Sequence, residues 1–161
     1  MTADLRFKAQ EATLGYNFDG EIKIGGNYVA VVRDGNHIYI SGQIPRVGDT
    51  VITIGSAGQE VTLAEAQTAA KICTMRALAL LQRSLGSLER VKAIPRITVY
   101  VRSGPAFTQQ SEVADGASEV LFSVLGPIGS HTRTSVGVLQ LPKGATVEVD
   151  LIATVENSIE V

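Results

Sequence analysis

The chain has 161 residues, of which 45% are hydrophobic and 19% are charged, and its formal net charge at pH 7 is −2. This length is typical of one domain, and a disordered chain would need lower hydrophobicity and a higher net charge. The slight acidic excess argues against a nucleic-acid partner, and no apolar run reaches the roughly 18 residues of a membrane span. We therefore expect a soluble, cytoplasmic protein with no nucleic-acid or membrane partner.

The first 26 residues predict a short helix followed by a polar connector. Residues 2–14 carry partial apolar periodicity and end at Gly15, and residues 16–26 are mostly polar. The segment lacks the apolar core and the small-residue cleavage site of a secretory signal peptide. We assign residues 1–26 to an N-terminal extension and residues 27–161 to one folded domain.

A β-hairpin is predicted directly after the extension, with Tyr28 opening its first strand. Two runs of β-branched or aromatic residues, at 28–32 and 37–41, flank an Asp34-Gly35 pair. Asp-Gly between such runs is a strong hairpin signal. Residues 50–55 predict a further short strand.

A long helix is predicted from Thr62 to Gly86. Thr62 and Glu65 form a capping box, in which the threonine oxygen accepts from the backbone N–H three residues later. Apolar residues follow at helical spacing, and Gly86 is a typical helix end. Cys73 lies on the apolar side of this helix and is expected to be an inert core residue. As the one cysteine of the chain, it excludes an internal disulfide framework.

The C-terminal half predicts a strand at 94–101, a helix within 107–125 and two strands at 133–139 and 146–155. The segment Asp115-Gly116-Ala117-Ser118 could interrupt the helix. We expect the last two strands to pair as a hairpin about Pro142 and Lys143. In that pairing Glu148 faces Gly137, roughly 13 Å along the strand from Arg133. One small ligand could then touch both only if the arginine leans inward or if neighbouring subunits supply the rest of the site.

This order of elements predicts an α+β fold: a two-layer sandwich with two helices packed on one face of a mixed β-sheet. Valines and isoleucines occupy both faces of the predicted strands, so the face without helices should also be apolar. Other copies of the chain are expected to cover it in a closed, symmetric oligomer.

Three segments of the sequence resemble the RidA/YjgF superfamily of reactive intermediate deaminases, once labelled endoribonuclease L-PSP. They are Tyr28 through Ser41-Gly42-Gln43-Ile44-Pro45, then Thr98-Val99-Tyr100-Val101, and the block from Arg133-Thr134-Ser135-Val136 through Leu141-Pro142-Lys143 to Ala153. The resemblance implies a chorismate-mutase-like fold that forms a homotrimeric barrel, with active sites in the clefts between subunits.

The resemblance also implies an activity, the hydrolytic deamination of small 2-imino or enamine acids to 2-oxo acids and ammonia, without a cofactor. Arg133 stands at the position of the carboxylate-binding arginine, and Glu148 at that of the glutamate that orients water. Tyr28 and Ser41 match pocket-lining residues, and the backbone of Gly42 next to Ser41 would fix the other end of the substrate.

Two positions depart from the deaminase pattern and, with the extension, indicate a divergent branch. Asp115, or Ser111 in an alignment without gaps, stands where the deaminases carry asparagine. Ser135 stands where they carry cysteine. Both residues are therefore candidate substrate-binding residues.

The candidate catalytic residues also have simpler interpretations. The guanidinium of Arg133 can grip a planar carboxylate through two parallel hydrogen bonds, or it can pair with a nearby acid at the surface. Glu148 and Asp150 point to one side of a strand, where a buried carboxyl with a raised pKa could move a proton or where both could be solvated.

Two functions therefore remain open on the sequence alone: a deaminase, and a trimeric module that binds a small carboxylate without turnover. The acidic balance weighs against a ribonuclease, which needs a basic surface. No metal site is expected, because His37 and His131 have no partner at ligand spacing.

Overall fold

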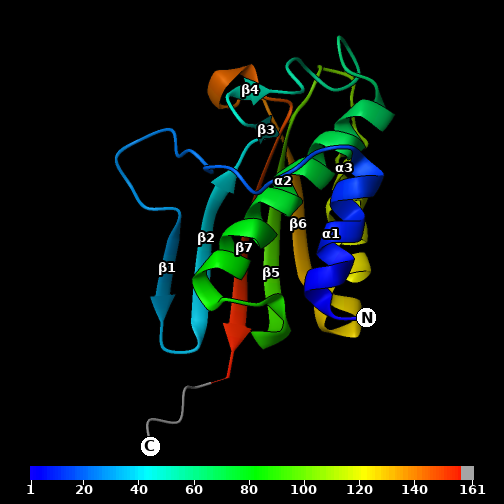
Figure 1. The fold of residues 1–161 in the computed structure, drawn as a ribbon. Helices are drawn as coiled ribbons and strands as arrows, with labels where there is room; N and C mark the ends of the chain where they lie inside the picture. The colour runs from blue at the N-terminus through cyan, green and yellow to red at the C-terminus, as the bar shows by residue number, and fades with distance from the viewer. Residues whose placement is uncertain (157–161) are drawn as a thin grey trace, which may run out of the picture.

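The computed structural model describes residues 1–156, and the last five residues of the predicted domain, 157–161, lie outside the described part. A mixed β-sheet carries helices on one of its faces (Figure 1). In chain order the elements are α1 (Ala3–Leu14), β1 (Val31–Asp34), β2 (His37–Gln43), β3 (Arg46–Val47), β4 (Thr50–Val51), α2 (Leu63–Leu85), β5 (Val91–Arg102), α3 (Gln110–Leu125), β6 (Thr132–Val138) and β7 (Val147–Val155). Three short 3₁₀ turns lie at Leu88–Arg90, Gly126–Gly129 and Pro142–Gly144. The α+β prediction is confirmed.

The main sheet has the strand order β1-β2-β7-β5-β6. β5 and β6 run parallel and are joined by α3, whereas the other neighbouring pairs are antiparallel. β5 therefore separates β6 from β7, and the predicted pairing of the last two strands as a hairpin is wrong. The physical reason is the helical crossover, which lets two strands pair in parallel and places β6 at the edge of the sheet.

The long helix α2 forms as its capping residues predict. The Oγ of Thr62 accepts a hydrogen bond of 3.1 Å from the N–H of Glu65, and Gly86 ends the helix. Cys73 is fully buried in the middle of α2, and its thiol donates to the carbonyl of Val147. The expected core position of this cysteine is confirmed.

The second long helix, α3, runs without interruption through Asp115-Gly116-Ala117-Ser118. Gly116 is needed for packing, because a Cβ atom there would lie 2.4 Å from the carbonyl oxygen of Gln67 on α2. The glycine lets the two helices approach closely and leaves the helical backbone intact.

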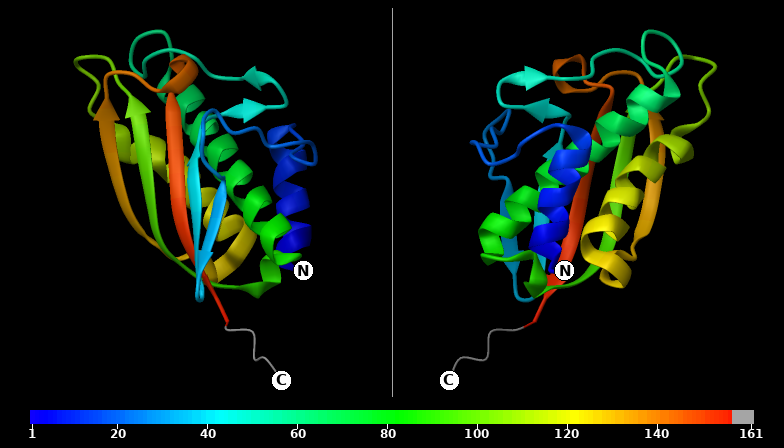
Figure 2. Two further views of the ribbon diagram at one scale, coloured as in Figure 1. Left: turned by 90° about the vertical axis from the view of Figure 1, so that its left-hand side faces the viewer. Right: turned by 45° about the vertical axis from the view of Figure 1, so that its right-hand side comes forward.

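The N-terminal extension packs onto the rest of the fold (Figure 2). Phe7 of α1 and Phe18 of the connector are buried in the common hydrophobic core, with their rings in edge-to-face contact. The carboxylate of Asp4 accepts hydrogen bonds from Ser87 and from the N–H of Leu88. The Asp4 contacts hold α1 against the end of α2, and the Phe18 contact holds the start of the connector on the core.

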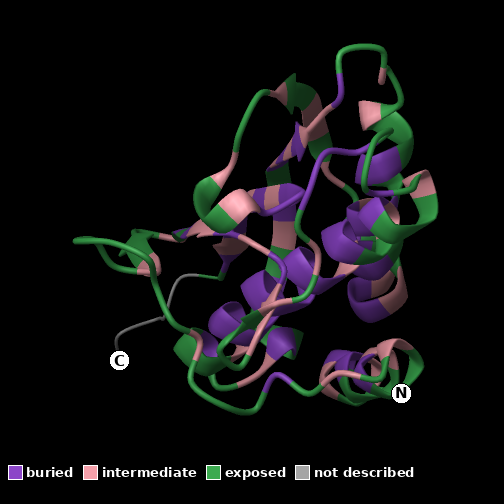
Figure 3. Cartoon of the chain, turned by 90° about the horizontal axis from the view of Figure 1, so that it is seen from above, coloured by how far each residue is buried: buried purple, intermediate pink, exposed green. Residues whose placement is uncertain are grey.

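The helices leave the opposite face of the sheet uncovered (Figure 2). The buried residues, coloured purple in Figure 3, belong mainly to the strands and to the helices that cover the other face. Along β7, Val147 and Val149 are fully buried and alternate with the partly exposed Glu148 and Asp150. Exposed apolar side chains on the same uncovered face include Val32 and Val136. This face is therefore mixed rather than apolar throughout, because most of the predicted apolar strand residues point toward the helices.

Within residues 1–156, no helix combines the length and the apolar character needed to cross a membrane.

Candidate functional site

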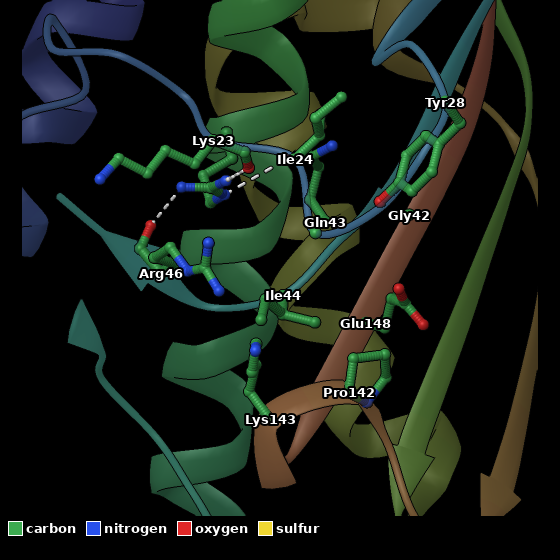
Figure 4. A pocket seen from close by; sticks show the side chains of 12 residues that line it. Lys23, Ile24, Tyr28, Gly42, Gln43, Ile44, Arg46, Pro142, Lys143 and Glu148 are labelled. Carbon is green, nitrogen blue, oxygen red and sulfur yellow. Dashed lines mark hydrogen bonds between the residues drawn. The ribbon is translucent and has the colours of Figure 1, made fainter. Parts of the chain in front are cut away.

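A cavity of about 170 Å³ lies where β2 ends beside β7 (Figure 4). Its walls come from the connector, the end of β2, helix α2, the turn before β7 and β7 itself. The lining residues are Lys23, Ile24, Gly25, Tyr28, Gly42, Gln43, Ile44, Arg46, Arg76, Pro142, Lys143 and Glu148. Three residues selected on the sequence, Tyr28, Gly42 and Glu148, thus line one cavity.

Glu148 lies directly against the backbone of Gly42. A Cβ atom at position 42 would lie 2.6 Å from Oε1 of Glu148, which is closer than two such atoms can approach. The pairing of β2 with β7 is irregular between Ile40 and Gln43, so Gly42 sits in a bulge. The missing side chain at this bulge leaves the space that the Glu148 carboxyl group occupies.

Burial raises the pKa of the Glu148 carboxyl above its ordinary value, and the nearby charge of Asp150 raises it further. A carboxyl group whose pKa moves toward neutrality can accept and return a proton during a reaction at physiological pH. The environment of Glu148 thus suits a general base. Its side chain also lines the cavity, where a ligand could reach it.

Tyr28 and Ser41 lie on neighbouring segments, but only Tyr28 lines the cavity, whereas Ser41 makes a structural hydrogen bond. Tyr28 lies ahead of β1, which begins at Val31, so the prediction that it opens the strand is wrong. Its side chain is 48% exposed and lines the cavity. The Ser41 hydroxyl donates to the carbonyl of Val29 at 2.8 Å. Ser41 therefore ties the segment that carries Tyr28 to β2.

Four basic side chains of the same cavity were not selected on the sequence: Lys23, Arg46, Arg76 and Lys143. They come from the connector, β3, α2 and the turn before β7, and no sequence spacing relates them. Arg76 is buried, and it donates to the side chain of Gln43 and to the carbonyls of Arg46 and Lys23. Lys23 forms an ion pair with Asp49, which points its amino group away from Glu148 (Figure 4).

Arg133, on the edge strand β6, faces helix α3. One terminal nitrogen donates to Asp115 at 2.8 Å and to Ser118 at 2.9 Å, and the other donates to the hydroxyl of Ser111 at 2.9 Å. Asp115 is 64% exposed, so water screens its ion pair with Arg133. Ser135 follows on the same face of β6, where it pairs with Val99 of β5.

Ser118 and His131 extend this second group and were not selected on the sequence. The hydroxyl of Ser118 lies 2.7 Å from Nε2 of His131, whose Nδ1 lies 2.6 Å from the carbonyl of Gly129. A carbonyl can only accept, so Nδ1 donates to Gly129. The spacing of Ser111, Asp115 and Ser118 along one face of a helix is the signal that could have revealed this group.

The structure does not bring Arg133 and Glu148 together within one chain. Arg133 pairs with Ile97 of β5, and Ile97 pairs with Leu151 of β7, three residues from Glu148. Ile97 and Leu151 point toward the helices, so Glu148 points to the opposite face. Glu148 stands opposite Tyr100, not opposite Gly137 as the predicted hairpin required. At ordinary strand spacings the two Cα atoms are roughly 14 Å apart.

The seven selected residues thus form two groups. The cavity group contains Tyr28, Gly42 and Glu148, and the edge group contains Asp115, Arg133 and Ser135. Ser41 adjoins the cavity group but does not line the cavity as expected, because its hydroxyl bonds to the carbonyl of Val29. Residues 1–156 hold no cluster of three or more acidic, histidine or cysteine side chains that could bind a metal ion.

Comparison with known proteins gives a consistent result. Residues 12–155 match a family described as YjgF/chorismate mutase-like, a candidate endoribonuclease family. The chain is 39% identical to Protein TCP17 of Trypanosoma cruzi over 158 residues, which is 98% of this chain and 99% of that protein. A solved structure from Shewanella oneidensis, described as a candidate endoribonuclease, superimposes with a TM-score of 0.89 at 26% identity, covering 96% of this chain and 100% of the other.

The fold also resembles that of TdcF from Escherichia coli, which was solved with bound serine. The TM-score is 0.60 at 23% identity, with 83% of this chain and 91% of that chain covered. At this identity the likeness concerns the fold alone.

Proposed function

Because this chain belongs to the YjgF/chorismate mutase-like family, we propose that it hydrolyses small 2-imino or enamine acids to 2-oxo acids and ammonia. The observation that carries this proposal is the Glu148 carboxyl group, which has a raised pKa and occupies a cavity next to Gly42 and Tyr28. A carboxylate in this position can orient one water molecule and remove its proton.

The proposed reaction needs little from the protein, since the imine carbon is already electrophilic. Glu148 takes a proton from water while the water oxygen forms a bond to the imine carbon, whose electron pair moves to the nitrogen. The protonated Glu148 gives this proton to the nitrogen, which yields a carbinolamine and restores the carboxylate. In the second stage Glu148 takes the proton of the carbinolamine hydroxyl and passes it to the amino nitrogen. The C=O bond then forms as the C–N bond breaks, and ammonia and the 2-oxo acid leave.

The proposed site lies between two copies of the chain. The edge group supplies Arg133 for the substrate carboxylate, and the cavity group of the next copy supplies Glu148 for the water. The two groups lie on different surfaces, so contact between copies is head-to-tail, and such contacts form a ring when the rotation between copies closes. A homotrimer, which the resemblance implies, is the ring we propose.

The serine bound to TdcF supports a small carboxylate as the ligand. An α-amino acid has the size and the carboxylate of the proposed substrates, and the fold of TdcF is similar. The same ligand class would suit a module that binds without turnover, which is the alternative function.

An ammonia-release assay with imines freshly generated from several amino acids tests the proposal. We expect the wild-type protein to accelerate ammonia release and Glu148→Gln to abolish the acceleration while the 2-oxo acid still binds. Glu119→Gln, an equal change at an exposed residue of α3, is the control and should be fully active. If the wild-type protein turns over none of the imines but still binds the 2-oxo acid, the deaminase proposal is wrong and the non-catalytic binding module is the remaining function.

A further inference from the structure

The cavity that holds Glu148 has a second chemical character, which the proposed reaction does not use. Four of its lining residues are basic and one is acidic. Lys23 is paired with Asp49 outside the cavity, which leaves Arg46, Arg76 and Lys143 as the cationic cluster. None of these three forms an ion pair with an acidic side chain among residues 1–156.

Arg76 is held in place by hydrogen bonds, and neither Arg76 nor Arg46 is neutralised by an acidic side chain of the described residues. Arg76 is 3% exposed, and its described partners are a side-chain amide and two backbone carbonyls. Burial lowers the pKa of Arg76 to about 10, and the neighbouring charge of Arg46 acts in the same direction. The buried Nε of Arg46 has no hydrogen-bond partner in the described part of the chain. A buried donor without a partner is costly, and a ligand can supply the missing acceptor.

Lys143 completes the cluster from the turn before β7. Among the described residues it is the one non-glycine residue with a positive φ, 60°, in the 3₁₀ turn at Pro142–Gly144. Such a conformation is unfavourable for lysine, and the fold retains it. Figure 4 shows the amino group of Lys143 and the guanidinium of Arg46 on the side of the cavity away from Glu148 and Tyr28.

We infer that the ligand of this cavity carries a second anionic group, a carboxylate or a phosphate, bound by Arg46 and Lys143 with Arg76 behind them. This inference rests on the proposed function, in which Arg133 of a neighbouring copy binds the first carboxylate of the substrate. The substrate class is then narrowed to imines or enamines of 2-oxo acids with an acidic side chain. Glu148 would lie between the two anionic ends, beside the carbon that water attacks.

Equilibrium binding tests the inference without turnover. The probes are 2-oxoglutarate, its neutral side-chain amide 2-oxoglutaramate, and 2-oxo-4-phosphonobutanoate, which have nearly the same length. We expect the two acidic probes to bind about tenfold to a hundredfold more tightly than the amide, since each charge-assisted hydrogen bond contributes substantially. The acidic probe that binds more tightly identifies the anionic group.

Variants assign the effect to the cluster. Lys143→Gln and Arg46→Gln should each reduce the affinity for the acidic probes to near that of the amide and leave the affinity for the amide unchanged. Lys92→Gln removes the same charge from an exposed position of β5 and should change neither affinity. Equal binding of acid and amide by the wild-type protein, or an unchanged preference in both cluster variants, would overturn the inference.

The deaminase proposal and the inferred anionic site can be refuted independently of each other. Suppose that the imines of asparagine and glutamine release ammonia at the same rate as those of aspartate and glutamate. This result would refute the second anionic group and support the deaminase. Suppose instead that the acidic probes bind tightly, that this binding depends on the cluster, and that no imine releases ammonia. This result would support the anionic site and refute the deaminase.

Discussion

The carboxyl group of Glu148 occupies the volume that a side chain at Gly42 would fill, because a Cβ atom there would lie 2.6 Å from Oε1 of Glu148. The two residues come from different strands, β2 and β7, and meet at a bulge. The position of the candidate catalytic carboxyl thus depends on a glycine more than 100 positions away in the sequence.

Gly42→Ala should displace the Glu148 carboxyl group and sharply reduce the rate. The backbone at Gly42 is not left-handed, so alanine causes no backbone strain and the cost falls on Glu148. We expect ammonia release to fall at least tenfold with a small change in melting temperature. Gly20→Ala is the control, because nothing lies within 4 Å of its added Cβ atom. Full activity of Gly42→Ala would show that Glu148 need not hold this position.

Glu148→Gln should stabilise the protein at neutral pH while it abolishes turnover. The pKa of Glu148 is raised in the folded chain, so above the ordinary carboxyl pKa the folded chain retains a proton that the unfolded chain releases. The free energy of unfolding of the wild type therefore falls as pH rises through the window between the two pKa values. The stability advantage of the variant should disappear below about pH 4, as thermal unfolding at several pH values will show. A variant less stable than the wild type at every pH would contradict this account.

Arg133→Lys should weaken binding of 2-oxo acids about tenfold to a hundredfold, because a forked guanidinium becomes a point charge and hydrogen bonds to charged groups contribute roughly 1.5–3 kcal/mol each. The amide of the α-carboxylate is the control ligand and should lose little further affinity. Stability should fall only modestly, since the Asp115 side chain is 64% exposed and lysine keeps the charge that pairs with it. Unchanged binding with a much lower melting temperature would make Arg133 a structural residue that joins β6 to α3.

Cys73 should react slowly with thiol reagents in the native protein and rapidly after denaturation. The side chain is fully buried in α2, and burial raises the pKa of its thiol well above the ordinary value. Both effects reduce the amount of accessible thiolate. Timed labelling with and without denaturant measures the difference, and rapid native labelling would contradict the packing of α2.

Local signals predicted the elements of this fold better than their pairing. The capping residues of α2 and the Asp34-Gly35 turn act over a few residues, and both elements form as expected. The turn at Pro142 and Lys143 ends one strand and begins another without specifying the partner of either. The parallel pairing of β5 with β6 depends on the packing of α3, which no local pattern contains.

The same limit applies to the candidate site. Tyr28, Gly42 and Glu148 were found because a family resemblance relates distant positions, and the structure places them in one cavity. Arg46 and Arg76 were missed because isolated basic residues on different elements have no spacing that connects them. Their proximity comes only from the packing of α2 against the segment after β2.

Mixed oligomers of two inactive variants test the shared site most directly. Glu148→Gln and Arg133→Ala chains are co-expressed with different tags, and oligomers that contain both are isolated and assayed for ammonia release. If each site takes Glu148 from one copy and Arg133 from the next, each isolated mixed trimer has one intact site of its three, so up to about a third of wild-type activity should return. Mixed oligomers no more active than either variant alone would contradict a site shared between copies.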